Sequence, residues 1–194
     1  MQPATLSGPA LVRRARLHRR VRALLVFFVA ALVVSGVTAF PIESELRWLT
    51  GAMGAGPSAR PEEHGALLRW LLTVREGLGA TNRAYPFLAY GTDWLAFAHL
   101  VIAVLFVGPL RDPVRNRWVI EWGMIACIAV IPLALIAGEV RGIPFWWRLI
   151  DCSFGVFGIV PLWLCWRDVR EMERLDSRAG RHHATEPLPD PRPA

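Results

Sequence analysis

The sequence predicts an all-α integral membrane protein whose four transmembrane helices form a bundle. Four apolar stretches carry this prediction, at residues 23–40, 94–110, 118–137 and 145–166. Each is close to or above the roughly 17 residues that a helix needs to cross the hydrocarbon core of a bilayer. The chain is 54% hydrophobic over 194 residues, and because those residues gather in runs it is too apolar for an ordinary soluble domain.

Arginine placement predicts that both ends of the chain lie in the cytoplasm. All 22 basic residues are arginine, and fifteen of them lie before the first span, between the second and third spans, or after the fourth. Basic residues accumulate on the cytoplasmic side of membrane proteins. The absence of lysine is typical of a GC-rich bacterial genome, so we expect a multi-pass protein of a bacterial inner membrane.

The same pattern divides the chain into three parts. Residues 1–22 form a basic cytoplasmic segment, 23–166 the membrane domain, and 167–194 a cytoplasmic helix extension followed from Ala179 by a disordered tail. Residues 1–39 also resemble a cleavable signal peptide, ending in Val37-Thr38-Ala39. Retention of the first span is favoured because its apolar run of 18 residues is longer than a usual signal-peptide core.

Residues 41–93 form the one sizeable segment expected outside the bilayer. An apolar stripe predicts an amphipathic helix over 63–78, on the outer membrane surface or capping the bundle. Residues 82–90 are expected to be an extended entry to the second span, which Gly108-Pro109 should end. In the third span, Pro132 predicts a kink, and the short 138–144 segment predicts a tight hairpin with the fourth.

Charged residues inside the apolar spans are the first functional signal, because each costs several kcal/mol in lipid unless it is paired or hydrated. Arg148 and Asp151 lie three apart on one face of the fourth span, where they can pair. Gly155 and Gly158 continue that face and allow another backbone to approach. His99 in the second span lies at a similar depth, and Asp93 stands at its outer end.

Two interpretations of this outer polar layer stay open. In the first, Arg148 and Asp151 pair to fix the helix register while His99 bonds to a carbonyl. In the second, the layer is a pocket in which Asp151 orients or deprotonates His99, His99 acts as acid, base or proton carrier, and Arg148 and Asp93 contribute to binding, Arg148 through an anionic group. His99 and Asp151 are then the candidate catalytic residues.

A second polar cluster is expected at the inner edge of the membrane. Glu121 lies one turn inside the third span, near Arg111, Arg115 and Arg117. Salt bridges are the first interpretation of this cluster, and anionic lipid headgroups held by the spare arginines are the second.

No cofactor, metal or nucleic acid is expected. A single histidine lies within a span, so a bis-histidine haem lacks ligands, and the sequence contains no HExxH, GxSxG or Walker A motif. The pair His182-His183 is too few ligands for a specific metal site. The three cysteines lie inside the spans, where they are expected as buried apolar residues, and the arginines follow the spans rather than a nucleic-acid-binding motif.

These observations favour a non-enzymatic bundle that binds membrane lipids or a larger membrane partner, including a second copy of itself. One alternative is a membrane enzyme or proton-coupled carrier built on His99, Asp151 and Arg148. The other is a subunit of a larger transporter, which the small size of the chain favours.

Overall fold

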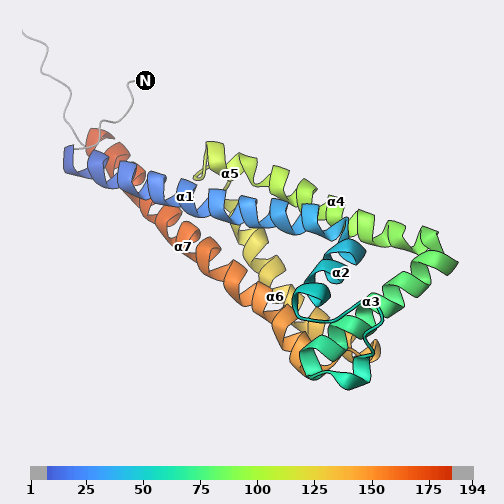
Figure 1. The fold of residues 1–194 in the computed structure, drawn as a ribbon. Coiled ribbons are helices and arrows are strands. Elements are labelled where there is room, and N and C mark those ends of the chain that lie inside the picture. The colour runs from blue at the N-terminus through green and yellow to red at the C-terminus, as the bar shows by residue number, and fades with distance from the viewer. Residues whose placement is uncertain (1–7, 185–194) are drawn as a thin grey trace, which may run out of the picture. The chain divides into compact units, whose positions relative to one another are not determined.

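The computed structural model describes residues 8–184, which are all-helical and contain no strand (Figure 1). In chain order the elements are α1 (Gly8–Ala39), α2 (Ile42–Ala52), η1 (Pro61–Glu63), α3 (Ala66–Ala84), η2 (Pro86–Ala89), α4 (Tyr90–Leu105), α5 (Val107–Arg111), α6 (Arg117–Val140) and α7 (Phe145–Ala184). Within this described part, four helical stretches are long and apolar enough to cross a membrane: Gly8–Ala39, Pro86–Arg111, Arg117–Val140 and Phe145–Ala179. The all-α class and the four long apolar helices are thereby confirmed.

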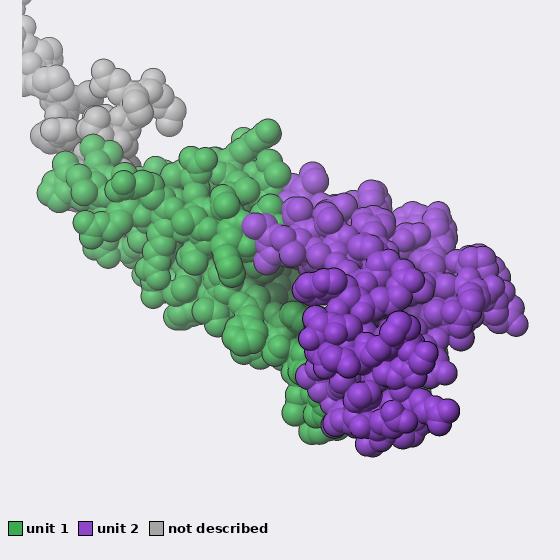
Figure 2. All heavy atoms as spheres, viewed as in Figure 1, with its two compact units in different colours: residues 1–29, 105–194 green, residues 30–104 purple. Residues whose placement is uncertain are grey.

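Residue contacts divide the chain into two compact units (Figure 2). The first unit combines Met1–Val29 with Leu105–Ala194, and the second is Ala30–Val104. The first unit therefore holds the start of α1 together with α5, α6 and α7. The second holds the end of α1 together with α2, α3 and α4.

In the first unit, α6 and α7 form the predicted hairpin. The turn is short, and Gly142 occupies it with a φ of +69°, a conformation that glycine adopts without strain. A Cβ atom on Gly155 would collide with the carbonyl oxygen of Cys127 and lie 2.6 Å from Cγ1 of Val130. A Cβ on Gly158 would lie 2.8 Å from the Cys127 sulfur. The predicted glycine face thus does bring another backbone close to α7.

The start of α1 and the end of α7 run antiparallel in the first unit as a helix pair, which we call the stalk. Its buried apolar residues include Val21 and Leu25 of α1 and Leu162, Cys165, Val169 and Met172 of α7. The spacing of three, four and three residues along α7 is that of a coiled-coil seam. Ion pairs flank the seam at Arg13–Glu171 (2.9 Å), Arg14–Asp176 (2.7 Å) and Arg20–Asp168 (3.5 Å).

The stalk shows that both ends of the described chain are helical. Residues 8–22, expected as part of a basic cytoplasmic segment, are the first half of α1, because an apolar seam and three acidic partners stabilise them as helix. Their cytoplasmic location stays a prediction. Helix α7 continues through Ala179 to Ala184 where a tail was expected, and the rest of that tail lies outside the described residues. At about 1.5 Å per residue, the 40 residues of α7 extend roughly 60 Å, twice the thickness of a bilayer core.

In the second unit, α2 packs on α3, and the end of α1 approaches α4 at Gly36. A Cβ on Gly36 of α1 would lie 3.0 Å from the carbonyl oxygen of Ala96 and 3.1 Å from Cβ of His99. Ala55, Leu71 and Leu72 are buried beside α2 and α3. The predicted amphipathic helix exists as α3, three residues later at its start and six at its end, whereas α2 was not predicted.

Proline explains a further difference. Residues 82–90 are not extended: Ala84 ends α3, Pro86 opens the 3₁₀ helix η2, and Tyr85 with φ −142° and ψ 67° lies between them. Gly108-Pro109 lies in the first turn of α5, where proline needs no N–H donor, and the second apolar stretch ends at Arg111, close to the pair as expected. Pro132 lies inside α6 as expected.

Replacement of Gly155 by alanine should destabilise the protein by about 1 to 3 kcal/mol, because the new methyl group meets a backbone oxygen that cannot move aside. The matched control is Gly77→Ala in the middle of α3, where a Cβ meets nothing within 4 Å. Because alanine favours a helix more than glycine does, this variant should be more stable than the wild type by roughly 0.5 to 1 kcal/mol. Thermal melting of both variants in detergent measures the difference. A Gly155→Ala protein that melts at or above the wild-type temperature contradicts the close contact.

Candidate functional site

Arg148 of the predicted outer layer pairs across the hairpin instead of along its own helix. Its guanidinium forms an ion pair with Glu139 of α6 and donates a hydrogen bond of 3.2 Å to the carbonyl oxygen of Leu135. The side chain is 12% exposed and passes over Gly138, where a Cβ would lie 2.6 Å from Cγ of Arg148. The expected Arg148–Asp151 ion pair is wrong, because Gly138 opens a path to a carboxylate on the facing helix.

The remaining members of the layer divide between the two units. Asp151, in the first unit, is half-buried and makes no side-chain hydrogen bond or ion pair with the described residues of that unit. His99, in the second unit, is half-buried with Nδ1 2.8 Å from the carbonyl oxygen of Leu95. That bond is the one expected if His99 has a structural role. Asp93 is exposed in the second unit, and the pocket joining these residues to Arg148 stays a prediction.

The inner-edge cluster is built around Arg117 at the start of α6. Its Nε donates to Glu121 at 3.0 Å, and its Nη1 forms an ion pair with Glu173 of α7 at 2.6 Å. The indole N–H of Trp166 donates to the same Glu121 carboxylate at 2.9 Å. The Arg117–Glu121 salt bridge is thus confirmed, while sequence reasoning missed Glu173 and Trp166, which lie about 50 residues away along the chain.

Other arginines at this edge differ in their partners. Arg111 and Arg115 are exposed, and no ion pair with a described residue involves them. Arg170 stacks on the ring of Trp166 at 4.7 Å, whereas Arg167 stacks on Trp163 at 5.7 Å and also forms an ion pair of 2.9 Å with Asp168. A groove of about 430 Å³, which we call the basic groove, is lined by Arg117, Arg170, Glu173, Arg174, Ser177 and Arg178.

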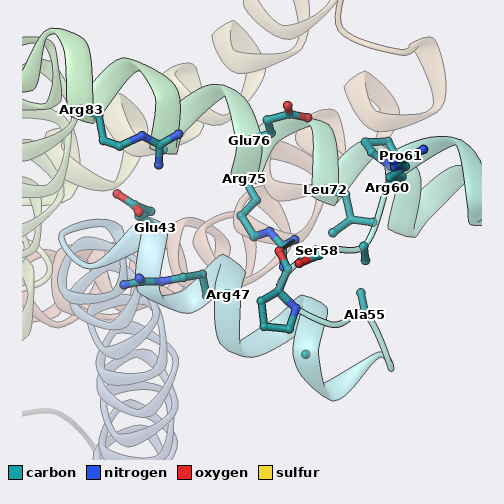
Figure 3. A pocket seen from close by; sticks show the side chains of 14 residues that line it. Glu43, Arg47, Ala55, Ser58, Arg60, Pro61, Leu72, Arg75, Glu76 and Arg83 are labelled. Atoms are coloured by element: carbon teal, nitrogen blue, oxygen red, sulfur yellow. Dashed lines mark hydrogen bonds between the residues drawn. The ribbon is translucent and has the colours of Figure 1, made fainter.

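The second unit contains a larger cavity of about 580 Å³ between α2 and α3 (Figure 3). Four arginines and two glutamates line it, and we call it the arginine cavity. Its charged residues are Glu43, Arg47, Arg60, Arg75, Glu76 and Arg83. This site was not predicted, because its arginines are spread over 37 positions and because α2, which forms one wall, was not expected as a helix.

No protein family model, curated protein or solved structure matches this chain. Within the described residues, no three histidine, cysteine, aspartate or glutamate side chains gather as a metal site would require. Function is therefore argued from the residues of the two arginine-lined sites and the apolar helices.

A double-mutant cycle tests the new partner of Arg148. Glu139→Gln and Arg148→Gln should show a coupling energy of about 0.5 to 3 kcal/mol in the free energy of unfolding, because the two side chains contact each other. The parallel cycle of Arg148→Gln with Asp151→Asn should be additive within about 0.5 kcal/mol. Unfolding in detergent measures both cycles, and stronger coupling to Asp151 than to Glu139 would restore the original pairing.

Proposed function

We propose that this protein is a multi-pass helix bundle of a bacterial inner membrane that binds anionic lipid headgroups at its cytoplasmic edge without catalysing a reaction. The observation that carries the proposal is the basic groove, in which Arg170, Arg174 and Arg178 follow the apolar stretch of α7 that ends with Trp163 and Trp166. A bilayer presents matching layers to these residues: its hydrocarbon core faces the apolar helix, its interface faces the tryptophans, and its anionic headgroups face the arginines.

Exposed apolar side chains support insertion into a membrane. On α6 and α7 the large ones exposed by half or more include Ile125, Ile128, Leu133, Ile136, Phe154 and Phe157. Soluble monomers rarely leave a continuous apolar surface of this kind in water. Charged and tryptophan side chains stand together near the start of each helix, as Arg117 and Trp118 do in α6 and Trp147 and Arg148 in α7, which suits the boundary of a bilayer.

The stalk supports a topology with both ends on one side. Its three ion pairs and its buried seam hold the start of α1 against the end of α7, so the two ends protrude together. The arginine excess on these two segments and on the turn before α6 supports the cytoplasm as that side.

The arginines of the basic groove support binding of lipid headgroups. A guanidinium presents paired N–H donors that match the oxygens of a phosphate, and stacking on a tryptophan ring holds it in place. Arg170 stacks in this way and belongs to no ion pair with a described residue. Each basic residue near an anionic membrane surface contributes about 1 kcal/mol, and this contribution weakens with salt.

The topology prediction uses a reporter that is active only in the cytoplasm. Fused after Ala179 it should give a signal, and inserted at Gly56 in the loop after α2 it should give none. The opposite pattern would reverse the orientation, and a signal at both positions would show that the chain between them does not cross a membrane an odd number of times.

The lipid prediction compares two double variants with the same loss of charge. Arg170→Gln with Arg174→Gln should lower the preference for phosphatidylglycerol over phosphatidylcholine by about 2 kcal/mol, roughly thirty-fold. The control, Arg69→Gln with Arg141→Gln, changes exposed arginines outside the basic groove and should keep the wild-type preference. Native mass spectrometry of the purified protein counts the retained lipids. Equal losses in the two variants would refute a specific edge site.

A further inference from the structure

We propose that the arginine cavity of the second unit is a binding site for a phosphomonoester group. The site uses none of the residues assigned to the lipid-binding edge, because all of its walls come from α2, α3 and the segment between them. Phosphate binding in the cavity therefore goes beyond the proposed function and can be tested independently of lipid binding at the basic groove.

Arg75 is the anchor of the cavity. Its Nη1 donates to the hydroxyl of Thr50 at 2.8 Å, and its Nη2 donates to the carbonyl oxygen of Pro57 at 3.5 Å. Thr50 is fully buried and in turn donates to the carbonyl oxygen of Leu46 at 2.7 Å. Figure 3 shows Arg75 reaching from α3 toward Ser58 in the segment after α2. These neutral oxygens hold the guanidinium in position without cancelling its charge, which leaves its other N–H groups for a ligand.

The charge of the cavity is also uncompensated from within. Four arginines face two glutamates, a net charge of +2, and no ion pair between described residues involves any of the six. Glu43 instead accepts a hydrogen bond of 2.8 Å from the amide of Asn82. The four arginines of the cavity therefore keep their positive charge, and an anion is the ligand that they can accept together.

The arginines come from three directions. Arg47 projects from α2, Arg60 from the segment before η1, and Arg75 and Arg83 from α3 (Figure 3). A Cβ on the buried Gly79 would lie 3.4 Å from Nη1 of Arg83 and 3.8 Å from Glu43, so the glycine lets both side chains lie against this wall. An anion in the cavity can therefore be approached by guanidinium groups on several sides.

Phosphomonoester chemistry matches this arrangement best. Such a group carries about −1.5 to −2 charges at neutral pH and offers three acceptor oxygens, which suits the net charge of +2. The cavity volume of about 580 Å³ falls within the roughly 300 to 1,000 Å³ of small-molecule sites. The two glutamates can accept hydrogen bonds from hydroxyl groups next to the phosphate. A free phosphate ester and the headgroup of a phosphatidic acid share this chemistry.

The experiment measures binding to the full-length purified protein in detergent by calorimetry. The soluble probe is glycerol 1-phosphate, and the lipid probe is a short-chain phosphatidic acid. The lipid arm uses the Arg170→Gln, Arg174→Gln background, so that binding at the edge does not contribute. We expect the lipid probe to bind, and the soluble probe to bind as well if the natural ligand is a free ester.

Variants of the cavity arginines then test whether the probes bind in the cavity. Arg75→Gln and Arg47→Gln should each weaken binding at least tenfold, because each removes a charged donor. Arg47→Gln keeps the test decisive if Arg75→Gln fails to fold, because Arg47 is exposed and bonds only to Ser44 of its own helix. The matched control is Arg69→Gln, on the same helix as Arg75 but bonded to the carbonyl oxygen of His64 and outside the cavity, and it should stay within twofold of wild type.

Each outcome decides the matter. Binding of both probes that the two cavity variants weaken identifies a free phosphate ester as a ligand, and binding of the lipid probe alone identifies a headgroup. Binding of neither probe overturns the site, and so does an equal loss in Arg69→Gln, which would reflect overall charge. Loss of binding only in the edge variant would assign the phosphate to the cytoplasmic edge and reject the cavity, whatever the fate of the lipid-binding proposal.

Discussion

The close approach of α6 and α7 is the contact on which the rest of the first unit depends. At Gly155 the backbone of α7 touches the carbonyl of Cys127, and at Gly138 the side chain of Arg148 crosses α6. In lipid there is little hydrophobic force between helices, so their association relies on contact of this kind through small residues. The pairing orients the 40 residues of α7, and through α7 it positions both the stalk and the basic groove.

Arginine serves two different purposes in this chain, and the partner decides which. Along the stalk, carboxylates of α7 hold Arg13, Arg14 and Arg20, and these pairs fix the register of the two helices beside an apolar seam. In the arginine cavity the guanidinium of Arg75 meets a hydroxyl group and a carbonyl oxygen, and in the basic groove that of Arg170 meets a tryptophan ring. The same groove also holds Arg117 and Arg174, which pair with Glu173 and Glu171. A guanidinium held by neutral groups keeps its charge available to an anion, which is why Arg75 and Arg170 are the arginines proposed to bind one.

The apolar helices could be predicted from the sequence because a span of lipid demands a long run of apolar residues, which is a local property. Helix α2 could not, because Ile42–Ala52 mixes glutamate, arginine and tryptophan and is short, so its helical form depends on packing against α3. The stalk was missed for a related reason. The start of α1 has the composition of a polar segment, and its helical pairing depends on acidic residues of α7 that lie more than 140 positions away along the chain.

Among the candidate site residues, pairs within one helix could be predicted and pairs between helices could not. Arg117 and Glu121 were paired correctly because they stand four apart on one helix, where the geometry is fixed by the sequence spacing. Spacing alone misassigned Arg148, since its long side chain can reach past its own helix to any acceptor that the fold provides. It lies in the first turn of α7, close enough to the hairpin turn to find Glu139, a residue that is 72% exposed. Asp151 lies one turn deeper on a short side chain and has no such route. Side-chain reach therefore separates two charges that lie three residues apart on one helix: Arg148 pairs across the hairpin, and Asp151 makes no ion pair with the described residues of the first unit.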